Sequence, residues 1–447
     1  MNPTTARTGL SPEEVRAKHK ELLFPNVANY YTKPLVLDRA EGLSVWDAEG
    51  REYLDFFGGI LTVSMGHCHP RIVNAIAEQA KRLGHTSTLY QSESLVTMAE
   101  RMSRLVPIEH KDGRLPKVFF TNSGSEADET ALVTARLFTG SREVMALRYG
   151  YSGRTAVGMT LTAHAGWRHW GEGVPGIKHT VQAYCYRCPF GLKYPSCEVK
   201  CAKDLEEKIQ TETPGKIAAT LVEPIQGVGG VITPPKEFFG LLADLTRKHG
   251  GLFISDEVQT GFGRTGKYWN GIEHWGVKPD IMTFAKGAAN GMPIGITVAR
   301  ADVADAFSGS TISTFGGNPL TMAAAGATLD LMQEENVPAR VERLGARFRA
   351  GLDGLHAKHP LIGEVRGLGL MQGVELVKDR ATKEPAPAET TALLEAAKDE
   401  GLLIGKGGLY GNVLRIAPPM LVSERQVDDA VGMLERAFVA VARKSNH

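Results

Sequence analysis

Short apolar runs alternate with helical stretches through the middle of this chain. The runs that read as strands are residues 118–121, 144–147, 218–222, 252–254, 281–284 and 294–298. This alternation predicts a mainly parallel sheet with helices on both faces, and thus the α/β class. In such sheets a ligand binds at the carboxyl ends of the strands. Functional side chains are therefore expected directly after these runs.

The segments before and after this region have a different pattern. Residues 42–57 alternate polar and apolar side chains around an acidic-glycine turn, which predicts a hairpin. From residue 336 onward, three helical stretches surround the apolar run 369–375 and predict an α+β domain. With 447 residues the chain is too long for one ordinary domain. We predict an N-terminal segment of a small lobe, a large domain and a C-terminal α+β domain, at residues 1–70, 71–335 and 336–447.

Composition excludes some classes of partner. Charged residues make up 23% and apolar residues 43% of the chain, as in ordinary globular enzymes, and the net charge is only +1. Because no basic block occurs, we expect no nucleic acid partner. Residues 1–21 lack the apolar core of a signal peptide, and no later run reaches 18 apolar residues. The expectation is a cytoplasmic protein without membrane contact.

A lysine and an aspartate end two of the predicted strands. Asp256 closes the run that begins at Leu252, and Lys286 follows Phe284 and Ala285 and precedes a glycine-rich stretch. Lysine condenses with carbonyl groups, and pyridoxal phosphate is bound by a lysine Schiff base with an acidic partner for its ring nitrogen. This pair therefore indicates a pyridoxal phosphate site with Lys286 and Asp256 as catalytic residues.

A phosphate site is predicted where residues 121–127, Thr-Asn-Ser-Gly-Ser-Glu-Ala, join a strand to a helix. Free backbone amides at a helix start bind anions. The same letters also fit an ordinary capping box, with either Ser123 and Glu126 or Ser125 and Asp128 as its partners. The strand before the motif and the lysine after it favour the anion site.

A second glycine motif, Gly-Phe-Gly-Arg-Thr-Gly at residues 261–266, matches the dinucleotide pattern. The residues after it show no sustained helical stripe, whereas a dinucleotide site needs a helix beneath the pyrophosphate. We therefore do not assign a nicotinamide or flavin dinucleotide site here.

Five motifs, in this order, resemble the class III pyridoxal phosphate aminotransferases of fold type I. They are the sequences at residues 122–127, 223–227, 256–266, 279–287 and 313–319, and the resemblance extends from about residue 34 to 440. Residues 55–70, 85–88, 401–407 and 414–418 are most similar to the alanine:glyoxylate aminotransferase 2 branch, which includes enzymes for β-amino acids. The resemblance implies the fold type I architecture, with a smaller α+β domain built from the N- and C-terminal segments.

The resemblance also implies roles for individual residues. Lys286 would bind the cofactor and move a proton on the substrate, while Asp256 would hold the ring nitrogen proton. The remaining cofactor contacts would come from Ser123, Gly124, Ser125, Tyr151, Glu223, Gln259 and Thr314. Among them Gln259 would bind the ring hydroxyl and Tyr151 would stack on the ring, although Ser152 replaces the histidine usual beside it. Thr314 would reach the cofactor of a second subunit, so a homodimer or a dimer of dimers is expected.

Substrate contacts are assigned by the same resemblance. Arg415 aligns with the arginine that binds a substrate carboxylate, and Arg154 is a weaker candidate. Ornithine- and 4-aminobutyrate-type relatives carry a glutamate where this chain has Val228, so Arg415 is expected to stay available. The favoured reaction moves an amino group from an α- or short β-amino acid to glyoxylate or pyruvate. Alternatives are an ω-amine or 4-aminobutyrate-type transaminase, a decarboxylase or aminomutase on the same fold, and a nonenzymatic binding protein.

Four of the five cysteines cluster as Cys185, Cys188, Cys197 and Cys201. Their spacing suits a structural zinc clip, although the gap between the pairs is short, and free thiols or a local disulfide are alternatives. No catalytic metal is expected. Two nearby histidines, His67 and His69, lack a third ligand and are interpreted as structural.

Overall fold

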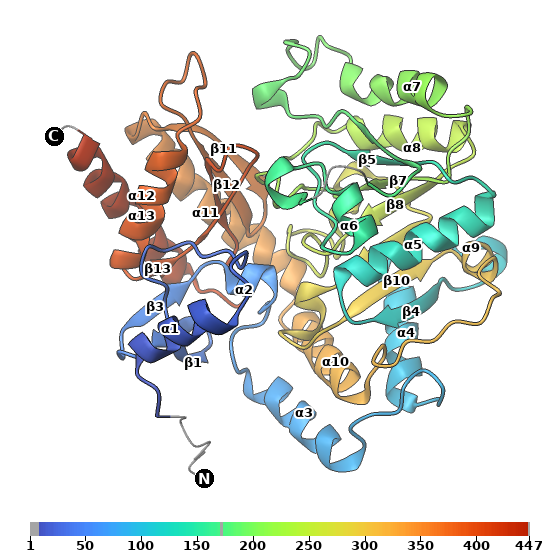
Figure 1. The fold of residues 1–447 in the computed structure, drawn as a ribbon, viewed down its shortest axis with the longest axis horizontal. Coiled ribbons are helices and arrows are strands. Elements are labelled where there is room, and N and C mark those ends of the chain that lie inside the picture. The colour runs from blue at the N-terminus through green and yellow to red at the C-terminus, as the bar shows by residue number, and fades with distance from the viewer. Residues whose placement is uncertain (1–8, 170–172, 446–447) are drawn as a thin grey trace.

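The computed structural model describes residues 9–169 and 173–445. Residues 1–8, which belong to the predicted N-terminal segment and to the stretch searched for a signal peptide, lie outside the described residues. The same is true of 446–447 in the predicted C-terminal domain. Figure 1 shows the N- and C-terminal segments together on one side of the molecule, and a large sheet with its helices on the other.

The large sheet has seven strands in the order β4-β10-β9-β8-β7-β5-β6. These are β4 (Lys117–Thr121), β5 (Val144–Leu147), β6 (Ile177–Thr180), β7 (Ala219–Val222), β8 (Leu252–Asp256), β9 (Ile281–Phe284) and β10 (Gly295–Ala299). All neighbours from β9 to β6 pair in parallel, whereas β10 is antiparallel to both β9 and β4. The mainly parallel α/β sheet predicted from the sequence is thus confirmed.

Every residue of β5, β7, β8, β9 and β10 is buried, because helices cover both faces of this sheet. The α-helices are α3 (Pro70–Arg82), α4 (Glu93–Leu105), α5 (Gly124–Thr139), α6 (Ala156–Leu161), α7 (Lys200–Glu212), α8 (Phe238–Lys248), α9 (Ala301–Asp305) and α10 (Pro319–Glu334). Short 3-10 helices are η1 (Lys111–Gly113), η2 (Ala165–Trp167), η3 (Cys185–Arg187), η4 (Gly271–Trp275) and η5 (Lys286–Ala289). Helix α5 packs across β8, β9 and β10 and so places its first turn beside their ends.

Two smaller sheets form the other side of the molecule. Their strands are β1 (Leu37–Glu41), β2 (Ser44–Asp47), β3 (Glu52–Asp55) and β13 (Leu402–Leu403) in one, and β11 (Ile362–Leu368), β12 (Met371–Leu376), β15 (Val413–Ile416) and β14 (Gly405–Gly407) in the other. The hairpin predicted at 42–57 is the antiparallel pair β2–β3. Strand β13 pairs in parallel with β3, so the N- and C-terminal segments share one sheet, as the fold type I resemblance implied.

The remaining helices pack on these sheets. They are α1 (Pro12–Leu22), α2 (Gly58–Leu61), α11 (Val337–Lys358), α12 (Pro387–Asp399) and α13 (Glu424–Ser445). The ring of Phe56, just after β3, meets the ring of Phe348 on α11 edge to face, with 5.8 Å between centroids. Apolar packing thus joins the two ends of the chain. The domain boundaries at residues 70 and 335 stay predictions.

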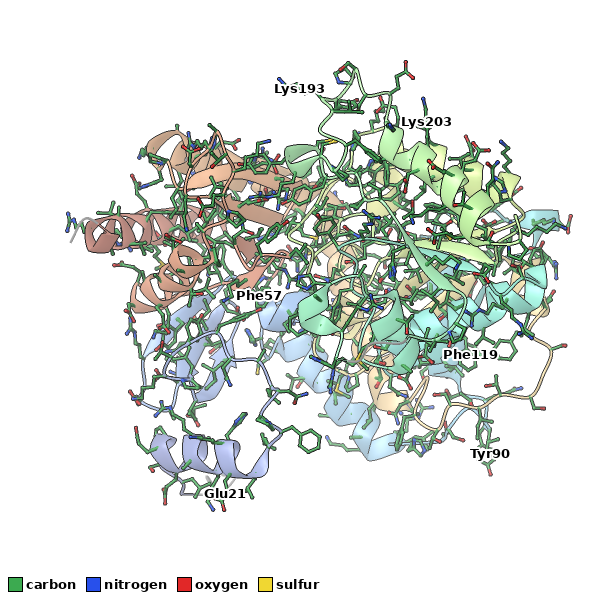
Figure 2. All side chains as sticks on the ribbon, turned by 45° about the horizontal axis from the view of Figure 1, so that its top comes forward. Glu21, Phe57, Tyr90, Phe119, Lys193 and Lys203 are labelled. Carbon is green, nitrogen blue, oxygen red and sulfur yellow. The ribbon has the colours of Figure 1, made fainter. Side chains whose placement is uncertain are left out.

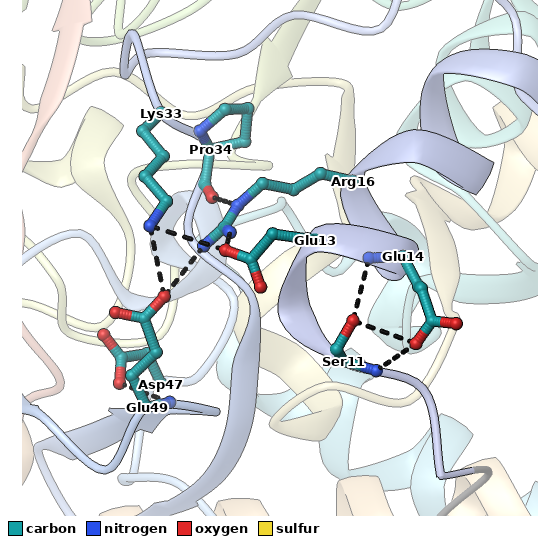
Figure 3. A network of polar contacts seen from close by, with 8 residues as sticks. All are labelled: Ser11, Glu13, Glu14, Arg16, Lys33, Pro34, Asp47 and Glu49. Carbon is teal, nitrogen blue, oxygen red and sulfur yellow. Dashed lines mark hydrogen bonds and ion pairs between the residues drawn. The ribbon is translucent and has the colours of Figure 1, made fainter.

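Helix α1 is attached to the β2–β3 hairpin by charged side chains, as Figure 3 shows. Ser11 caps the helix in a capping box with Glu14. Arg16 donates from Nε to the carbonyl of Pro34 at 2.8 Å and pairs with Glu49, which also pairs with Lys33 at 3.2 Å. Helix α1 has no buried residue, and these contacts join it to the rest of the N-terminal segment.

Candidate functional site

A cavity of about 670 Å³ opens at the carboxyl ends of the large sheet. It is lined by residues from the start of α5, the loop before α6, the end of β8 and the start of η5: Ser123, Gly124, Ser125, Asp128, Tyr151, Arg154, Asp256 and Lys286 among others. All of these except Asp128 were predicted as site residues from the sequence. These side chains therefore meet at the carboxyl ends of the strands, where the alternating pattern predicted a ligand site.

Lys286 follows β9 and begins η5 with a left-handed backbone, φ 37°. The next residue must be small, because a Cβ at Gly287 would lie 2.2 Å from Ser64 Oγ. Desolvation lowers the pKa of the Lys286 amine, while the negative charge of Asp256 partly offsets this effect. A lysine with a lowered pKa holds a larger neutral, nucleophilic fraction than a surface lysine does.

Asp256 ends β8 and is only 4% exposed. Its Oδ1 accepts a hydrogen bond from the backbone N–H of Val258 at 2.9 Å. Burial raises the pKa of Asp256 to about 6, against the opposing effects of that hydrogen bond and of Lys286. A buried carboxylate of this kind gains strongly from a positively charged partner such as a protonated ring nitrogen.

The first turn of α5 supplies an anion site. Ser123 is the N-cap: its hydroxyl accepts the N–H of Glu126 and donates to the Glu126 carboxylate. The backbone N–H that binds this carboxylate is that of Asn122 and not of Ser123, so the motif caps the helix without a complete capping box. By helix geometry the N–H groups of Gly124 and Ser125 have no acceptor within the helix. A Cβ at Gly124 would meet Val258 at 3.1 Å, so glycine allows the helix start to approach the strand ends. These free amides can hold a phosphate.

Arg415 on β15 is 4% exposed, and its Nη2 donates to Oε1 of Gln259 at 2.8 Å. Its guanidinium lies 5.2 Å from the ring centroid of Phe57, and Figure 2 places Phe57 near the boundary between the two sides of the molecule. Its Nε has no hydrogen-bond acceptor, and no carboxylate of the described residues forms a salt bridge with it. A buried guanidinium with a free N–H is suited to an anionic ligand.

Glu223 and Tyr151 are linked. Buried Glu223 follows β7 and accepts hydrogen bonds from the backbone N–H of Tyr151 at 2.9 Å and of Gly227 at 3.2 Å. Burial raises the pKa of Glu223 to about 8, with a further contribution from Asp256. Tyr151 lines the cavity and meets Trp167 edge to face at 5.8 Å. Glu223 thus fixes the backbone that carries the predicted stacking residue.

Thr314 lies apart from this cavity, on an exposed loop. The neighbouring Ser313 accepts hydrogen bonds through its carbonyl from Thr88, at 3.3 Å from the backbone and 3.2 Å from the hydroxyl. His85 and Phe315 have ring centroids 5.1 Å apart. The loop is therefore tied to residues 85–88 at the surface.

Sequence reasoning missed Asp128, Phe57 and Trp167 as parts of the site. Asp128 follows Gly124 by four positions, so helical spacing places both on one face, and this was an available signal. Phe57 contacts Arg415 and Trp167 contacts Tyr151, and no local sequence pattern predicts either contact.

Other motifs have structural explanations. The glycine motif at 261–266 is followed by η4 and not by an α-helix, and its glycines pack on α11, where Cβ atoms at Gly263 and Gly266 would each meet a neighbour at 2.8 Å. The four clustered cysteines are free thiols. Within residues 9–169 and 173–445, no group of three or more His, Cys, Asp or Glu side chains is placed to hold a metal ion. In the same ranges no helix is long and apolar enough to cross a membrane.

Known proteins resemble this chain over nearly its whole length. Residues 26–438 match the family model "Aminotransferase class-III". The chain is 41% identical to alanine–glyoxylate aminotransferase 2 homolog 2, mitochondrial, of Arabidopsis thaliana, over 96% of this chain and 88% of that protein. It is 37% identical to a leucine/methionine racemase of Thermococcus litoralis, over 96% of both chains. A crystal structure of an amine transaminase from an uncultivated Pseudomonas species, in its PLP-bound form, superposes with a TM-score of 0.86 at 32% identity, over 94% of this chain and 98% of that one.

The chain belongs to the class III aminotransferase family, whose members are enzymes of fold type I that use pyridoxal phosphate. The cavity fits this cofactor, since it combines a lysine with a lowered pKa, a buried carboxylate and free helix amides. When bound, pyridoxal phosphate supplies an aldehyde that condenses with amines and a ring that withdraws electrons. Amino-acid and 2-oxo acid substrates follow from membership of the family.

Proposed function

We propose that this enzyme moves an amino group from an α- or short β-amino acid, such as alanine or β-alanine, to glyoxylate or pyruvate. The reaction is ping-pong: the donor leaves as a keto acid before the acceptor binds. The observation that carries this proposal is Arg415, which is buried, has a free Nε and forms no salt bridge with a carboxylate of the described residues, although Glu223 acts on it electrostatically. Both donor and acceptor carry the carboxylate that such a guanidinium binds.

The site residues have distinct roles in this proposal, and two of them, Glu223 and Gln259, lie behind those that line the cavity. Lys286 Nζ would hold the cofactor and, once released by the substrate amine, would move the proton from the substrate Cα to the aldehyde carbon of the cofactor. In the second half-reaction it would move a proton in the opposite direction. Asp256 holds the proton of the ring nitrogen, and Tyr151 covers one face of the ring. Ser123, Gly124 and Ser125 bind the phosphate at the start of α5. Glu223 supports Tyr151, and the amide of Gln259 donates to the ring hydroxyl while its oxygen holds Arg415.

Val228 has no charge with which to neutralise Arg415, so the guanidinium stays available for a substrate carboxylate. Val228 is buried, and its carbonyl accepts the N–H of Gly408, so the loop lies against the segment before β15. A carboxylate at this position would neutralise the guanidinium, whereas valine does not. Gln259, the neutral partner of Arg415, orients the guanidinium without cancelling its charge. This arrangement supports a carboxylate-bearing substrate in both half-reactions, with Arg154 at the exposed edge as a secondary contact.

For Arg415→Ala we expect the KM for carboxylated donors and acceptors to rise by roughly 10- to 100-fold, because a hydrogen-bonded charge contact contributes about 1.5–3 kcal/mol. The KM for simple amines should change little. Steady-state kinetics with alanine, β-alanine and an uncharged amine measure the difference. Arg154→Ala is the matched control and should have a smaller effect. Equal losses for carboxylated and simple amines would make Arg415 a structural residue.

The substrate pair itself is tested by a matrix of amino donors against glyoxylate, pyruvate and 2-oxoglutarate. A preference for 2-oxoglutarate with terminal amines would favour the second candidate function, an ω-amine or 4-aminobutyrate-type transaminase, which the similarity to an amine transaminase supports. Turnover that needs no keto acid would select an isomerising enzyme instead, as the racemase relative suggests. Release of carbon dioxide would indicate a decarboxylase.

We also propose that the enzyme is a homodimer, or a dimer of dimers, in which Thr314 reaches the cofactor phosphate of the partner subunit. The support is an exposed apolar patch around the Thr314 loop, formed by Leu89, Tyr90, Ile312 and Phe315, each more than 60% exposed. In Figure 2 Tyr90 projects from the edge of the molecule. Clustered exposed apolar side chains of this size mark interaction surfaces. The cytoplasmic location inferred from sequence stays a prediction, and the Arabidopsis relative is mitochondrial.

Phe315→Asp is expected to raise the dissociation constant of the dimer by about tenfold or more, because a charge in an apolar contact is left unpaired. Sedimentation velocity across a dilution series measures this constant. Leu192→Asp, on the exposed loop before α7, is the control and should leave the constant unchanged. A wild-type protein that sediments as a monomer would refute the dimer.

A further inference from the structure

Asp128 is a carboxyl group to which the reaction gives no role, and it is not a capping acid either, because the N-cap of α5 is Ser123 and not Ser125. It lies in the second turn of α5, four residues after the phosphate-binding Gly124, and is only 1% exposed. The hydroxyl of Thr283 donates to its Oδ1 at 2.7 Å. Thr283 on β9 is the residue paired with Asp256 on β8. Asp128 and Asp256 therefore flank the same point of the sheet, and both line the cavity.

The two carboxyl groups have different supplies of hydrogen-bond donors. Asp256 receives the backbone N–H of Val258 and interacts with the Lys286 amine. Asp128 receives one neutral hydroxyl, and its carboxyl group interacts electrostatically with that of Asp256. Both carboxyl groups are buried beside Thr283, and the repulsion between two adjacent buried carboxylates favours a single proton shared between them. The carboxyl with the weaker donors is the one that retains it.

The charges of the surrounding elements agree with this location. Glu223, after β7, and Asp256, on β8, are acidic groups that face Asp128, and Lys286, after β9, is the basic group that faces it. Burial raises the pKa of Asp128 well above its ordinary value, and the charge of Asp256 adds to this effect. Thr283 and Lys286 act in the opposite direction but do not outweigh burial.

We propose that Asp128 keeps its proton and donates a hydrogen bond to Asp256, acting as a positioning residue for the carboxylate that holds the cofactor ring nitrogen. The bond orients Asp256 and stabilises its charged form, which is the form that attracts a protonated ring. Thr283 fixes the other oxygen of Asp128, so the hydroxyl of Asp128 points in one direction. This inference rests on the proposed role of Asp256.

Three variants test whether Asp128 acts on Asp256 as a hydrogen-bond donor, acts on it as a negative charge, or has no effect on it. Asp128→Asn keeps the shape and an N–H donor, Asp128→Ala removes the donor, and Glu129→Gln changes the adjacent acid on the same helix as a control. For each holoenzyme, kcat/KM is measured against pH, and the cofactor absorbance is titrated without substrate. We expect Asp128→Asn and Glu129→Gln to keep the wild-type acid limb. Asp128→Ala should move this limb to higher pH, because Asp256 without its donor binds protons more readily.

Two results would overturn the proposal. If Asn and Ala both move the acid limb to lower pH, Asp128 is charged in the native enzyme and repels Asp256. If neither variant moves it, Asp128 is a bystander. If Asp128→Ala fails to fold, Asp128→Asn still tests whether Asp128 is charged. Replacing a charged Asp128 removes a negative charge and moves the acid limb to lower pH. Replacing a protonated Asp128 keeps a hydrogen-bond donor and leaves the limb in place.

An infrared measurement makes the test independent of the reaction. In cofactor-free protein near neutral pH, a difference spectrum of wild type minus Asp128→Asn should show the C=O band of a protonated carboxylic acid. Absence of this band, with only carboxylate bands in the difference, would contradict the proposal even if Asp256 proves essential. Conversely, near-normal turnover in Asp256→Asn would remove the proposed role of Asp256 while the band could persist, so the two failures are distinguishable.

Discussion

Replacing Lys286 with alanine should abolish most amino transfer. The variant loses the only lysine among the described residues that line the cavity, and with it both the covalent hold on the cofactor and the base for the substrate Cα. Loss of a positioned acid–base group alone lowers rates by about 10²–10⁴-fold. The rate is measured with the preferred donor and acceptor under saturating cofactor. Borohydride treatment followed by intact mass measurement should add the cofactor mass to wild type and not to the variant.

A matched control for this change is Lys267→Ala, an exposed lysine in the loop before η4. It should keep both the rate and the borohydride adduct. Small primary amines should partly restore the Lys286→Ala rate, because the cavity left by the side chain can admit them. The thermal stability of the cofactor-free variant should not fall, since desolvation disfavours the lysine charge in the native fold. An unchanged rate or a persistent adduct would place the covalent link at another residue.

The central strands of the large sheet, β5 and β7 to β10, could be predicted because they are buried on both faces, which makes each of them a largely apolar run. Strand β6, Ile177–Thr180, was missed for the opposite reason: it is the edge strand and carries Lys178 and His179 within four residues. The antiparallel direction of β10 also has no local signal, because a buried run reads the same in either direction. Direction is decided by the connection and by packing, which involve distant residues.

Some residues of the site could likewise be predicted from the sequence, and others could not. Lys286 and Asp256 could be predicted because they directly follow strands whose carboxyl ends meet at one edge. The hydrogen bond between Arg415 and Gln259 joins residues 156 positions apart, and nothing in either segment encodes it. Asp128 resembles an ordinary acid near a helix start, where acids are favourable in any case. Only the packing of α5 on the sheet turns this side chain inward to Thr283 and Asp256.

Asp256→Asn should leave the cofactor bound but lower turnover by about 10²–10⁴-fold, because a neutral amide no longer stabilises a protonated ring nitrogen. The amide oxygen can still accept the N–H of Val258, so the loop should keep its shape. Burial raises the pKa of Asp256 to about 6, which means that its charge is costly to the fold, and the variant should be no less stable. Turnover, cofactor affinity and melting temperature are measured together.

The neighbouring Glu257→Gln is the control, because this buried acid serves the fold. Its oxygens accept the N–H groups of Gly271 and Ile272, both at 2.8 Å. It should lower the melting temperature and leave turnover close to wild type, the reverse of Asp256→Asn. If Asp256 is the group that Asp128 positions, Asp128→Ala in the Asp256→Asn background should no longer move the acid limb, since no carboxylate remains to be tuned. A shift that persists in the double variant would mean that Asp128 acts through another group.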